Sequence, residues 1–181
     1  MKSIFLLLVI ALASSCTQET QDSQTQPDIE ILVSEITNRT FLQLKKEREL
    51  YPFGIGSGIK DQVRMLALSF CYYKDIEMEQ ARELLLAATS RYLDNINRSN
   101  DLRPFLVNHP FEPKNIEIRI FLRKPDGSNR DNDKNDKLSL IEMIRGNLEY
   151  DIRNPQTGHL ECYLEESYEE AFKIHGNAVS L

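Results

Sequence analysis

Side chains with oxygen ligands recur at regular intervals in one polar segment of the chain. Asp131, Asp133 and Asn135 occupy its first, third and fifth positions, and Glu142 occupies its twelfth. A hard cation such as Ca²⁺ takes about six to eight oxygen ligands, and side chains at this spacing can surround it where the backbone turns tightly. The spacing therefore predicts a candidate calcium site at these four residues.

The segment 131–142 resembles the calcium loop of the EF-hand family, with two departures. Its sixth position is Asp136, where the family has a glycine for the sharp turn, and a strand pattern precedes it where the family has a helix. The alternative is that residues 126–137 form a solvated hairpin tip, in which short polar side chains bond to nearby backbone groups. The two departures favour the hairpin, and a calcium-stabilised module is the rival hypothesis.

Two cysteines, Cys71 and Cys162, remain for the folded part of the chain if Cys16 belongs to an export signal. In an exported protein such a pair can form a disulfide, which would close a loop of about 91 residues and stabilise the fold by roughly 4 kcal/mol through loop-closure entropy. Two buried, unreactive thiols are the alternative. The sequence leaves both open, and no histidine has the spacing that would make either cysteine a nucleophile.

Glutamates crowd the end of the chain, and paired carboxylates can act as general acid and base. They are Glu161, Glu165, Glu166, Glu169 and Glu170. An exported hydrolase that uses Glu165 and Glu169 is the enzymatic hypothesis. Such a run is more commonly the solvated face of a helix, whose first carboxylates complement the helix dipole. No second partner group accompanies them, so we predict no catalytic residue and no cofactor apart from the calcium alternative.

Neither the histidines nor the glycines supply a further motif. His109, His159 and His175 form no paired metal signature. The glycines at positions 54, 56 and 58 lack the spacing of a dinucleotide-binding loop, and we expect them to form a turn or a mobile loop.

The first sixteen residues combine the features of an export signal. Lys2 is positive, residues 4–13 run apolar without interruption, and three small residues, Ala13, Ser14 and Ser15, precede Cys16. The apolar run is shorter than the 20 or so residues that a membrane-spanning helix needs.

This segment resembles the signal of bacterial lipoproteins, in which small residues precede a cysteine that is diacylated before the signal is cleaved. The resemblance covers residues 1–16 and departs from the family at Ala13, where leucine is preferred. It implies removal of residues 1–15, a lipid on Cys16, and attachment to the membrane of the bacterial cell envelope through acyl chains such as palmitate. An ordinary secretory signal is the alternative.

Composition indicates one folded domain behind this signal. The chain has 181 residues, of which 41% are hydrophobic and 28% charged, and its formal net charge is −6. This negative charge disfavours nucleic acid as a partner. Residues 17–27 contain no large apolar side chain, so residues 16–27 are predicted to be a lipidated cysteine and a flexible tether about 20 Å in reach. Residues 28–181 are predicted to form a single α+β domain.

Two long segments carry apolar side chains at helical spacing and begin near Asp28 and Asp75. A third helix is expected over residues 165–175, ending at Gly176. The side chains expected to be buried in it are Tyr168, Ala171 and Phe172.

Strand patterns separate these helices, and the regular alternation of residues 116–122 is the clearest. The predicted strands are residues 63–73, 116–122, 138–144, 148–153 and 160–164. The order of elements indicates an α+β fold, with a largely antiparallel sheet of about 4–5 strands packed with two or three helices. The apolar stretch 102–111, interrupted by proline, is the best candidate for a contact surface, and burial in the core is the equal alternative. The expected function is a non-enzymatic binding or structural module that contacts an envelope protein or a cell-wall component.

Overall fold

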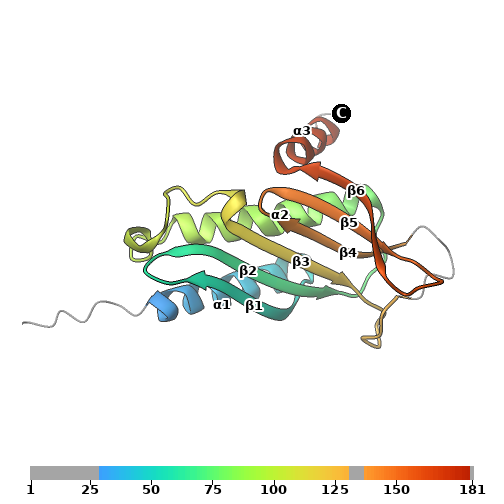
Figure 1. Ribbon diagram of the computed structural model, residues 1–181, viewed down its shortest axis with the longest axis horizontal. Helices are drawn as coiled ribbons and strands as arrows, with labels where there is room; N and C mark the ends of the chain where they lie inside the picture. The colour runs from blue at the N-terminus through green and yellow to red at the C-terminus, as the bar shows by residue number, and fades with distance from the viewer. Residues whose placement is uncertain (1–28, 131–136, 180–181) are drawn as a thin grey trace, which may run out of the picture.

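The computed structural model describes residues 29–130 and 137–179, with side chains up to residue 176. These residues form three helices and one six-stranded sheet (Figure 1). The elements, in chain order, are α1 (Ile29–Arg48), β1 (Tyr51–Ile59), β2 (Val63–Tyr72), α2 (Met78–Asn97), β3 (Ile116–Leu122), β4 (Leu138–Ile144), β5 (Asn147–Arg153), β6 (Leu160–Ser167) and α3 (Tyr168–Val179), with single 3₁₀ turns at Arg103–Phe105 and Pro113–Asn115.

The strands lie in the sheet in the order in which they occur in the chain, β1 to β6. All neighbours are antiparallel except β2 and β3, which are parallel because α2 carries the chain back to the start of the sheet between them. The predicted α+β class, the largely antiparallel sheet and the three helices are confirmed. The sheet has six strands instead of the four or five expected.

The additional strand is β1, and it contains the glycines that were expected to form a turn or a loop. Gly54, Gly56 and Gly58 pair in register with Ser69, Ala67 and Met65 of β2. A β-carbon added at Gly56 would lie 3.3 Å from the β-carbon of Ala67, which is a tight contact. Low strand propensity is therefore overridden here by pairing with β2, because β propensity depends strongly on the neighbouring strand.

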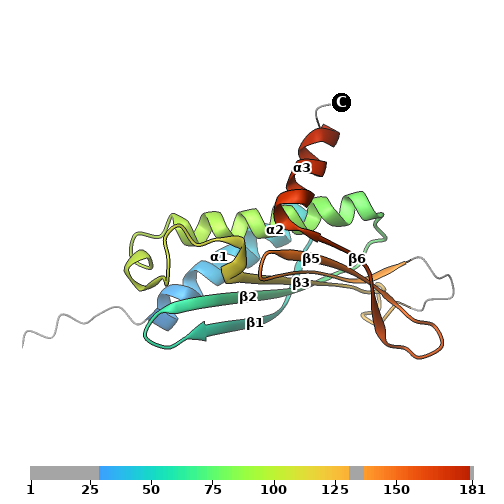
Figure 2. The same cartoon turned by 45° about the horizontal axis from the view of Figure 1, so that its top comes forward.

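Helices α1 and α2 lie along the same face of the sheet (Figures 1 and 2). Every second residue of β3 is buried beneath them, as the alternation of residues 116–122 predicted. The largest fully buried side chains include Leu44 of α1, Phe70 of β2, Leu85 and Tyr92 of α2, and Tyr150 of β5. Among the described residues no helix covers the opposite face of the sheet, which we call the open face.

Helix α2 begins at Met78, and its N-cap is Glu77, which forms a reciprocal capping box with Gln80. Asp75, near which this helix was expected to begin, instead forms ion pairs with Arg130 and Lys137. Arg130 Nη1 lies 2.7 Å from one of its carboxylate oxygens, and Lys137 Nζ lies 3.1 Å from the other. Hydrogen bonding from Lys137 and the charge of Arg130 lower the pKa of Asp75. One carboxylate therefore contacts Arg130 and Lys137, the two described residues on either side of positions 131–136.

The proline-interrupted stretch 102–111, the candidate contact surface, is mostly part of the core. Leu102, Leu106 and Phe111 are 0%, 5% and 2% exposed, and Leu106 forms an isolated bridge with Val63 at the start of β2. Only Val107 among its large aliphatic side chains is substantially exposed. The prolines prevent long regular elements but not burial, so of the two alternatives for this stretch the structure supports the core.

The last helix also differs from its prediction. Strand β6 continues to Ser167, so α3 begins three residues later than expected, and it runs through Gly176 to Val179. Ala171 is buried as predicted, whereas Phe172 is 58% exposed. Helix α3 projects beyond the end of β6 and meets α2 through Tyr168 with Ser90 and His175 with Glu79, which leaves the Phe172 side of the helix without a covering element among the described residues (Figure 2).

Candidate functional site

The open face carries two groups of side chains that could bind a ligand. Alternate residues of β3, β4 and β5 point to this face, and the paired strands bring Arg119 of β3 beside Glu142 of β4, with Glu149 of β5 next in line. Arg119 binds Glu142 at 2.8 Å and Glu117 at 3.3 Å. The centre of the face is thereby partly neutralised, and the two groups lie on either side of it.

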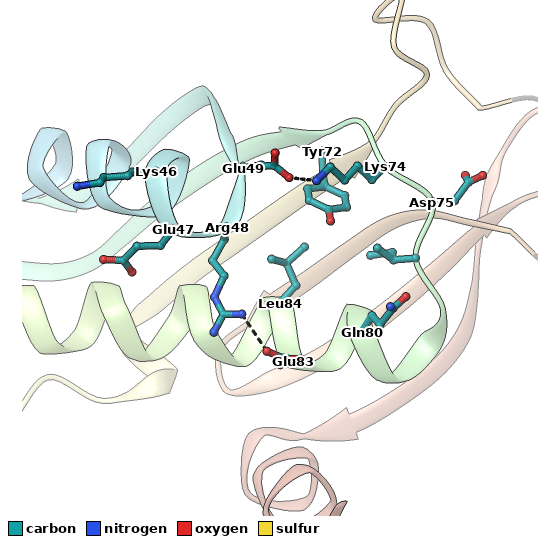
Figure 3. A pocket seen from close by; sticks show the side chains of 11 residues that line it. Lys46, Glu47, Arg48, Glu49, Tyr72, Lys74, Asp75, Gln80, Glu83 and Leu84 are labelled. Atoms are coloured by element: carbon teal, nitrogen blue, oxygen red, sulfur yellow. Dashed lines mark hydrogen bonds and ion pairs between the residues drawn. The ribbon is translucent and has the colours of Figure 1, made fainter. Parts of the chain in front are cut away.

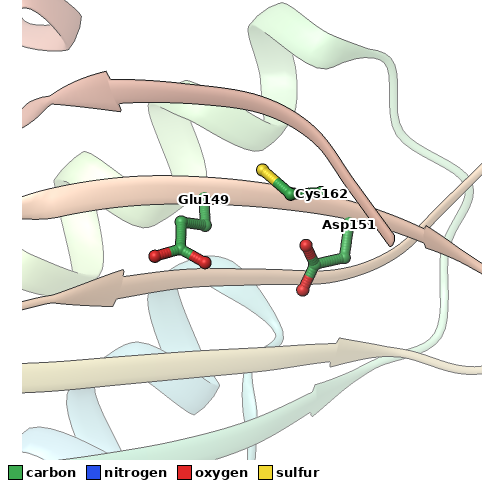
Figure 4. A group of neighbouring side chains, drawn as sticks. All are labelled: Glu149, Asp151 and Cys162. Carbon is green, nitrogen blue, oxygen red and sulfur yellow. The ribbon is translucent and has the colours of Figure 1, made fainter. Parts of the chain in front are cut away.

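The first group, which we call the β5–β6 cluster, consists of Glu149, Asp151 and Cys162 (Figure 4). Asp151 and Cys162 are direct partners across the two strands, and Glu149 is two residues before Asp151 on the same face. One oxygen of each carboxylate and the sulfur of Cys162 all lie within 4.8 Å of one another. This separation is close to that of side chains sharing one metal ion.

Burial and like charges perturb all three groups of this cluster. Burial raises the pKa of Asp151 to about 6, and the neighbouring Glu142 and Glu149 add to the effect. Burial, followed by repulsion from Glu142 and Glu165, raises the pKa of Glu149, and burial followed by repulsion from Asp151 raises the pKa of the Cys162 thiol. In each case the negative form is disfavoured where it stands.

The second group, which we call the aromatic patch, consists of Tyr51, Phe53, Tyr73, Phe121 and Arg123. Phe53 and Phe121 meet with ring centroids 5.2 Å apart, and Tyr51 and Tyr73 meet at 5.3 Å, both pairs in edge-to-face geometry. The guanidinium of Arg123 lies 5.8 Å from the ring of Phe53 and 5.5 Å from that of Phe121. The patch is held together by these contacts although Phe53 is 59% exposed.

On the opposite, helix-covered side of β5 and β6 lies a buried ion pair that the sequence did not reveal. Glu166 accepts hydrogen bonds from Arg82 Nε and from the Tyr150 hydroxyl, both at 2.7 Å, and Arg82 also pairs with Glu79. Burial raises the pKa of Tyr150, and its bond to Glu166 adds to the shift. Glu166 was expected on a solvated helix face, whereas the extension of β6 turns it into the core.

A polar hollow of about 560 Å³ lies between the end of α1, the end of β2 and the start of α2 (Figure 3). Its charged groups pair with one another, Arg48 with Glu83 at 2.9 Å and Lys74 with Glu49. Both pairs are largely exposed, and such pairs typically contribute at most about 1 kcal/mol. Glu47 and Asp75 also have cationic partners, and the apolar lining is limited to Tyr72, Ile76 and Leu84, so among the described residues the hollow offers no carboxylate lacking a cation.

Three of the four predicted calcium ligands, Asp131, Asp133 and Asn135, lie outside the described residues, as does Cys16, the predicted lipidation site. The fourth, Glu142, belongs to β4, where it is bound to Arg119. Residues 126–130 do form part of the connection between two antiparallel strands, and Asp126 accepts hydrogen bonds from the Ser128 backbone and hydroxyl as predicted for a polar turn.

The two cysteines do not form a disulfide. Cys71 is buried on β2 and Cys162 is exposed on β6, and both are free thiols. Strands β3, β4 and β5 separate them, and at about 4.8 Å per strand this places them far beyond the 7 Å or so that a bridge can span. Of the two alternatives that the sequence left open, this fold supports free thiols, although Cys162 is not buried.

Glu165 and Glu169, the carboxylates of the hydrolase hypothesis, are both exposed but belong to different elements, β6 and α3. Asn147 donates to Glu165 at 3.3 Å. Within the described residues the two carboxylates share no hydrogen-bonding partner. The geometry does not supply a paired acid and base there.

The sequence reasoning missed Asp151, although part of the signal was present. Residues 147–152 alternate polar and apolar, which places Glu149 and Asp151 on one face of a strand. Cys162 gave no such signal. Strand β6 has a bulge at Tyr163, because Tyr150 pairs with Leu164 and Asp151 pairs with Cys162. The bulge places Cys162 on the same face as Asp151, whereas simple alternation would place it on the other face.

Comparison of the chain with models of protein families, with curated proteins and with solved structures finds no match to any of them. In the part of the chain that the structure describes, no helix has both the length and the hydropathy needed to cross a membrane.

Proposed function

We propose that the protein is a lipid-anchored lipoprotein of the bacterial cell envelope, and that its folded part is a non-enzymatic module that binds another protein. The observation that carries this proposal is the aromatic patch on the open face. The resemblance of residues 1–16 to a lipoprotein signal supports the location, with Cys16 as the lipidated residue and the polar tether leading to α1.

The aromatic patch has the composition of a protein contact. Aromatic and arginine side chains are enriched where protein surfaces bury their central contacts, because they combine a large apolar area with few rotatable bonds. Phe53 is 59% exposed and Tyr51 is 40% exposed, so both retain apolar area that a partner could cover. Their ring contacts with Phe121 and Tyr73 hold them in place, which reduces the entropy lost on binding.

The positive charge beside the aromatic patch indicates the charge of the partner's contact surface. A hollow of about 290 Å³ adjoins Tyr73 and Arg123, and the charged side chains that line it are Asp75, Arg123, Lys124, Arg130 and Lys137. Cations outnumber carboxylates here although the whole chain is acidic. A partner segment that combines apolar and acidic side chains matches both features.

Affinity capture from detergent-solubilised envelope tests the proposal. The full-length protein, its Phe53→Ser variant and a matched control, Phe172→Ser, serve as baits. Phe172 is 58% exposed on α3, away from the patch, so both substitutions remove a similar exposed area. We expect wild type and the control to capture the same protein, and Phe53→Ser to bind that purified protein at least about tenfold more weakly.

Raised salt should weaken the same binding, because screening reduces the attraction between the cationic hollow and an acidic segment. Equal binding by Phe53→Ser and Phe172→Ser would contradict the proposal. Binding of wild type to isolated cell-wall saccharide instead of protein would replace the partner by a glycan. Mass spectrometry of the native N-terminus tests the anchor separately, with a diacylglyceryl group expected on Cys16.

A further inference from the structure

The β5–β6 cluster brings together three potential metal ligands through the pairing of two strands. Glu149 and Asp151 are two residues apart on β5 and therefore point to the same face. Cys162 lies directly opposite Asp151, and the bulge at Tyr163 turns its thiol to that face. The two carboxylates and the sulfur offer ligand atoms within 4.8 Å of one another (Figure 4).

A second observation points to a cation at this place. Asp151 is only 7% exposed, and within the described residues its carboxylate has neither a hydrogen bond nor an ion pair, so solvent is all that reaches its oxygens. The charges that act on it are those of Glu142 and Glu149, which are of the same sign. Buried carboxylates are normally paired or hydrogen-bonded, because leaving water without a partner is unfavourable for a charge. The Cys162 thiol has only a long contact, at 3.5 Å, to the Leu164 carbonyl.

The ligand types select the metal. Ca²⁺ and Mg²⁺ take oxygen ligands, whereas a thiolate with two carboxylates suits Zn²⁺. Zinc lies about 2.3 Å from sulfur and about 2.0–2.2 Å from carboxylate oxygen, so tetrahedral ligands are roughly 3.3–3.7 Å apart. Side-chain rotation, chiefly of the longer Glu149, can shorten the present separations to these values.

We propose that Glu149, Asp151 and Cys162 bind one Zn²⁺ on the open face of the sheet. The Cys162 sulfur loses its proton to solvent as it binds the metal, and the ion bridges β5 and β6. Three protein ligands leave a fourth position for water or for a group of another molecule. This inference does not depend on the aromatic patch, which lies toward the other edge of the same face on β1 to β3.

Calorimetric titration of Zn²⁺ into the metal-free, full-length protein tests the site. We expect one ion per chain in wild type and binding at least about tenfold weaker in Asp151→Asn and in Cys162→Ser. Cys71→Ser is the matched control, because Cys71 is buried on β2 and should leave the affinity unchanged. Asp151→Asn removes a buried charge without a partner, so loss of binding in that variant would not arise from loss of the fold.

Substitution by Co²⁺ gives a second, spectroscopic readout. Wild type should show the near-ultraviolet band of a thiolate bound to Co²⁺ and the visible bands of tetrahedral cobalt, and Cys162→Ser should lack the thiolate band. Absence of heat and of the band in wild type, or affinity and spectra that are the same in Cys162→Ser and wild type, would overturn the proposal. Either result would leave capture by the aromatic patch untouched.

Discussion

Strands β5 and β6 carry two buried carboxylates, one on each face of the sheet, and their surroundings are opposite in kind. The Glu166 side chain is 8% exposed and accepts hydrogen bonds from Arg82 and Tyr150. Residue Asp151 is 7% exposed, and among the described residues the charges that act on it are those of carboxylates. Both carboxylates are largely removed from solvent, and the difference lies in which groups contact them.

The cause of this difference is the layer that covers each face. Helix α2 lies over the face that Glu166 occupies and supplies Arg82, so the carboxylate is neutralised from within the chain. The open face has no such layer among the described residues, and the cross-strand partners of Asp151 are Leu140 and Cys162, neither of which supplies a positive charge. Glu166 thus stabilises the fold through its ion pair with Arg82, whereas Asp151 is a candidate ligand for a bound cation.

The largest expected effect comes from removing the partner of the satisfied carboxylate. Arg82→Leu leaves Glu166 buried with only the Tyr150 hydroxyl, and we expect the free energy of unfolding to fall by about 3 kcal/mol or more. Arg48→Leu is the control, because its pair with Glu83 is largely exposed and should contribute less than about 1 kcal/mol. Urea denaturation at pH 7.5 measures both, and equal losses would show that Glu166 is not held as described.

Removal of the Asp151 charge is expected to raise the free energy of unfolding, by less than the Arg82 substitution lowers it. The pKa of Asp151 is raised to about 6 in the folded protein, above its usual value near 4 when unfolded, so the folded state favours the protonated form. Wild type should lose stability as pH rises from about 4 to about 6 and should level off above that range.

Asp151→Asn removes this loss. In the presence of a chelator it should exceed wild type in stability by about 1–2 kcal/mol at pH 7.5, and the two should be equal near pH 4. Denaturation curves at the two pH values provide the comparison. If the variant is less stable than wild type at pH 7.5 without metal, Asp151 has a stabilising partner and the contrast with Glu166 fails.

The smallest effect concerns thiol reactivity beside the same carboxylate. Exposed Cys162 should react with a disulfide reagent in the native protein, whereas buried Cys71 should react only after unfolding. Because burial and the charge of Asp151 raise the pKa of Cys162, Asp151→Asn should accelerate its reaction at pH 8 by less than about tenfold. An unchanged rate, measured by absorbance, would mean that Asp151 does not act on the thiol.

Local patterns predicted the elements in which buried and exposed residues recur at a regular interval. The alternation of residues 116–122 and the apolar stripe that became α2 were confirmed, because one buried face imposes its period on the residues beneath it. The failure was β1, where glycines at alternate positions indicate a loop locally, yet pairing with β2 makes a strand. For the stretch 102–111 local patterns left surface and core open, and packing decided for the core.

The sequence by itself determined the α+β class and the position of Glu149 and Asp151 on one face of a strand, because both follow from short-range periodicity. Only the tertiary structure decided that Arg82 meets Glu166, 84 residues away, and that a bulge turns Cys162 toward Asp151. Register and bulges depend on which strands become neighbours, and that choice is made by the whole core. The sequence therefore shows that Asp151 and Glu166 are present, but their partners, and hence their roles, follow only from the tertiary structure.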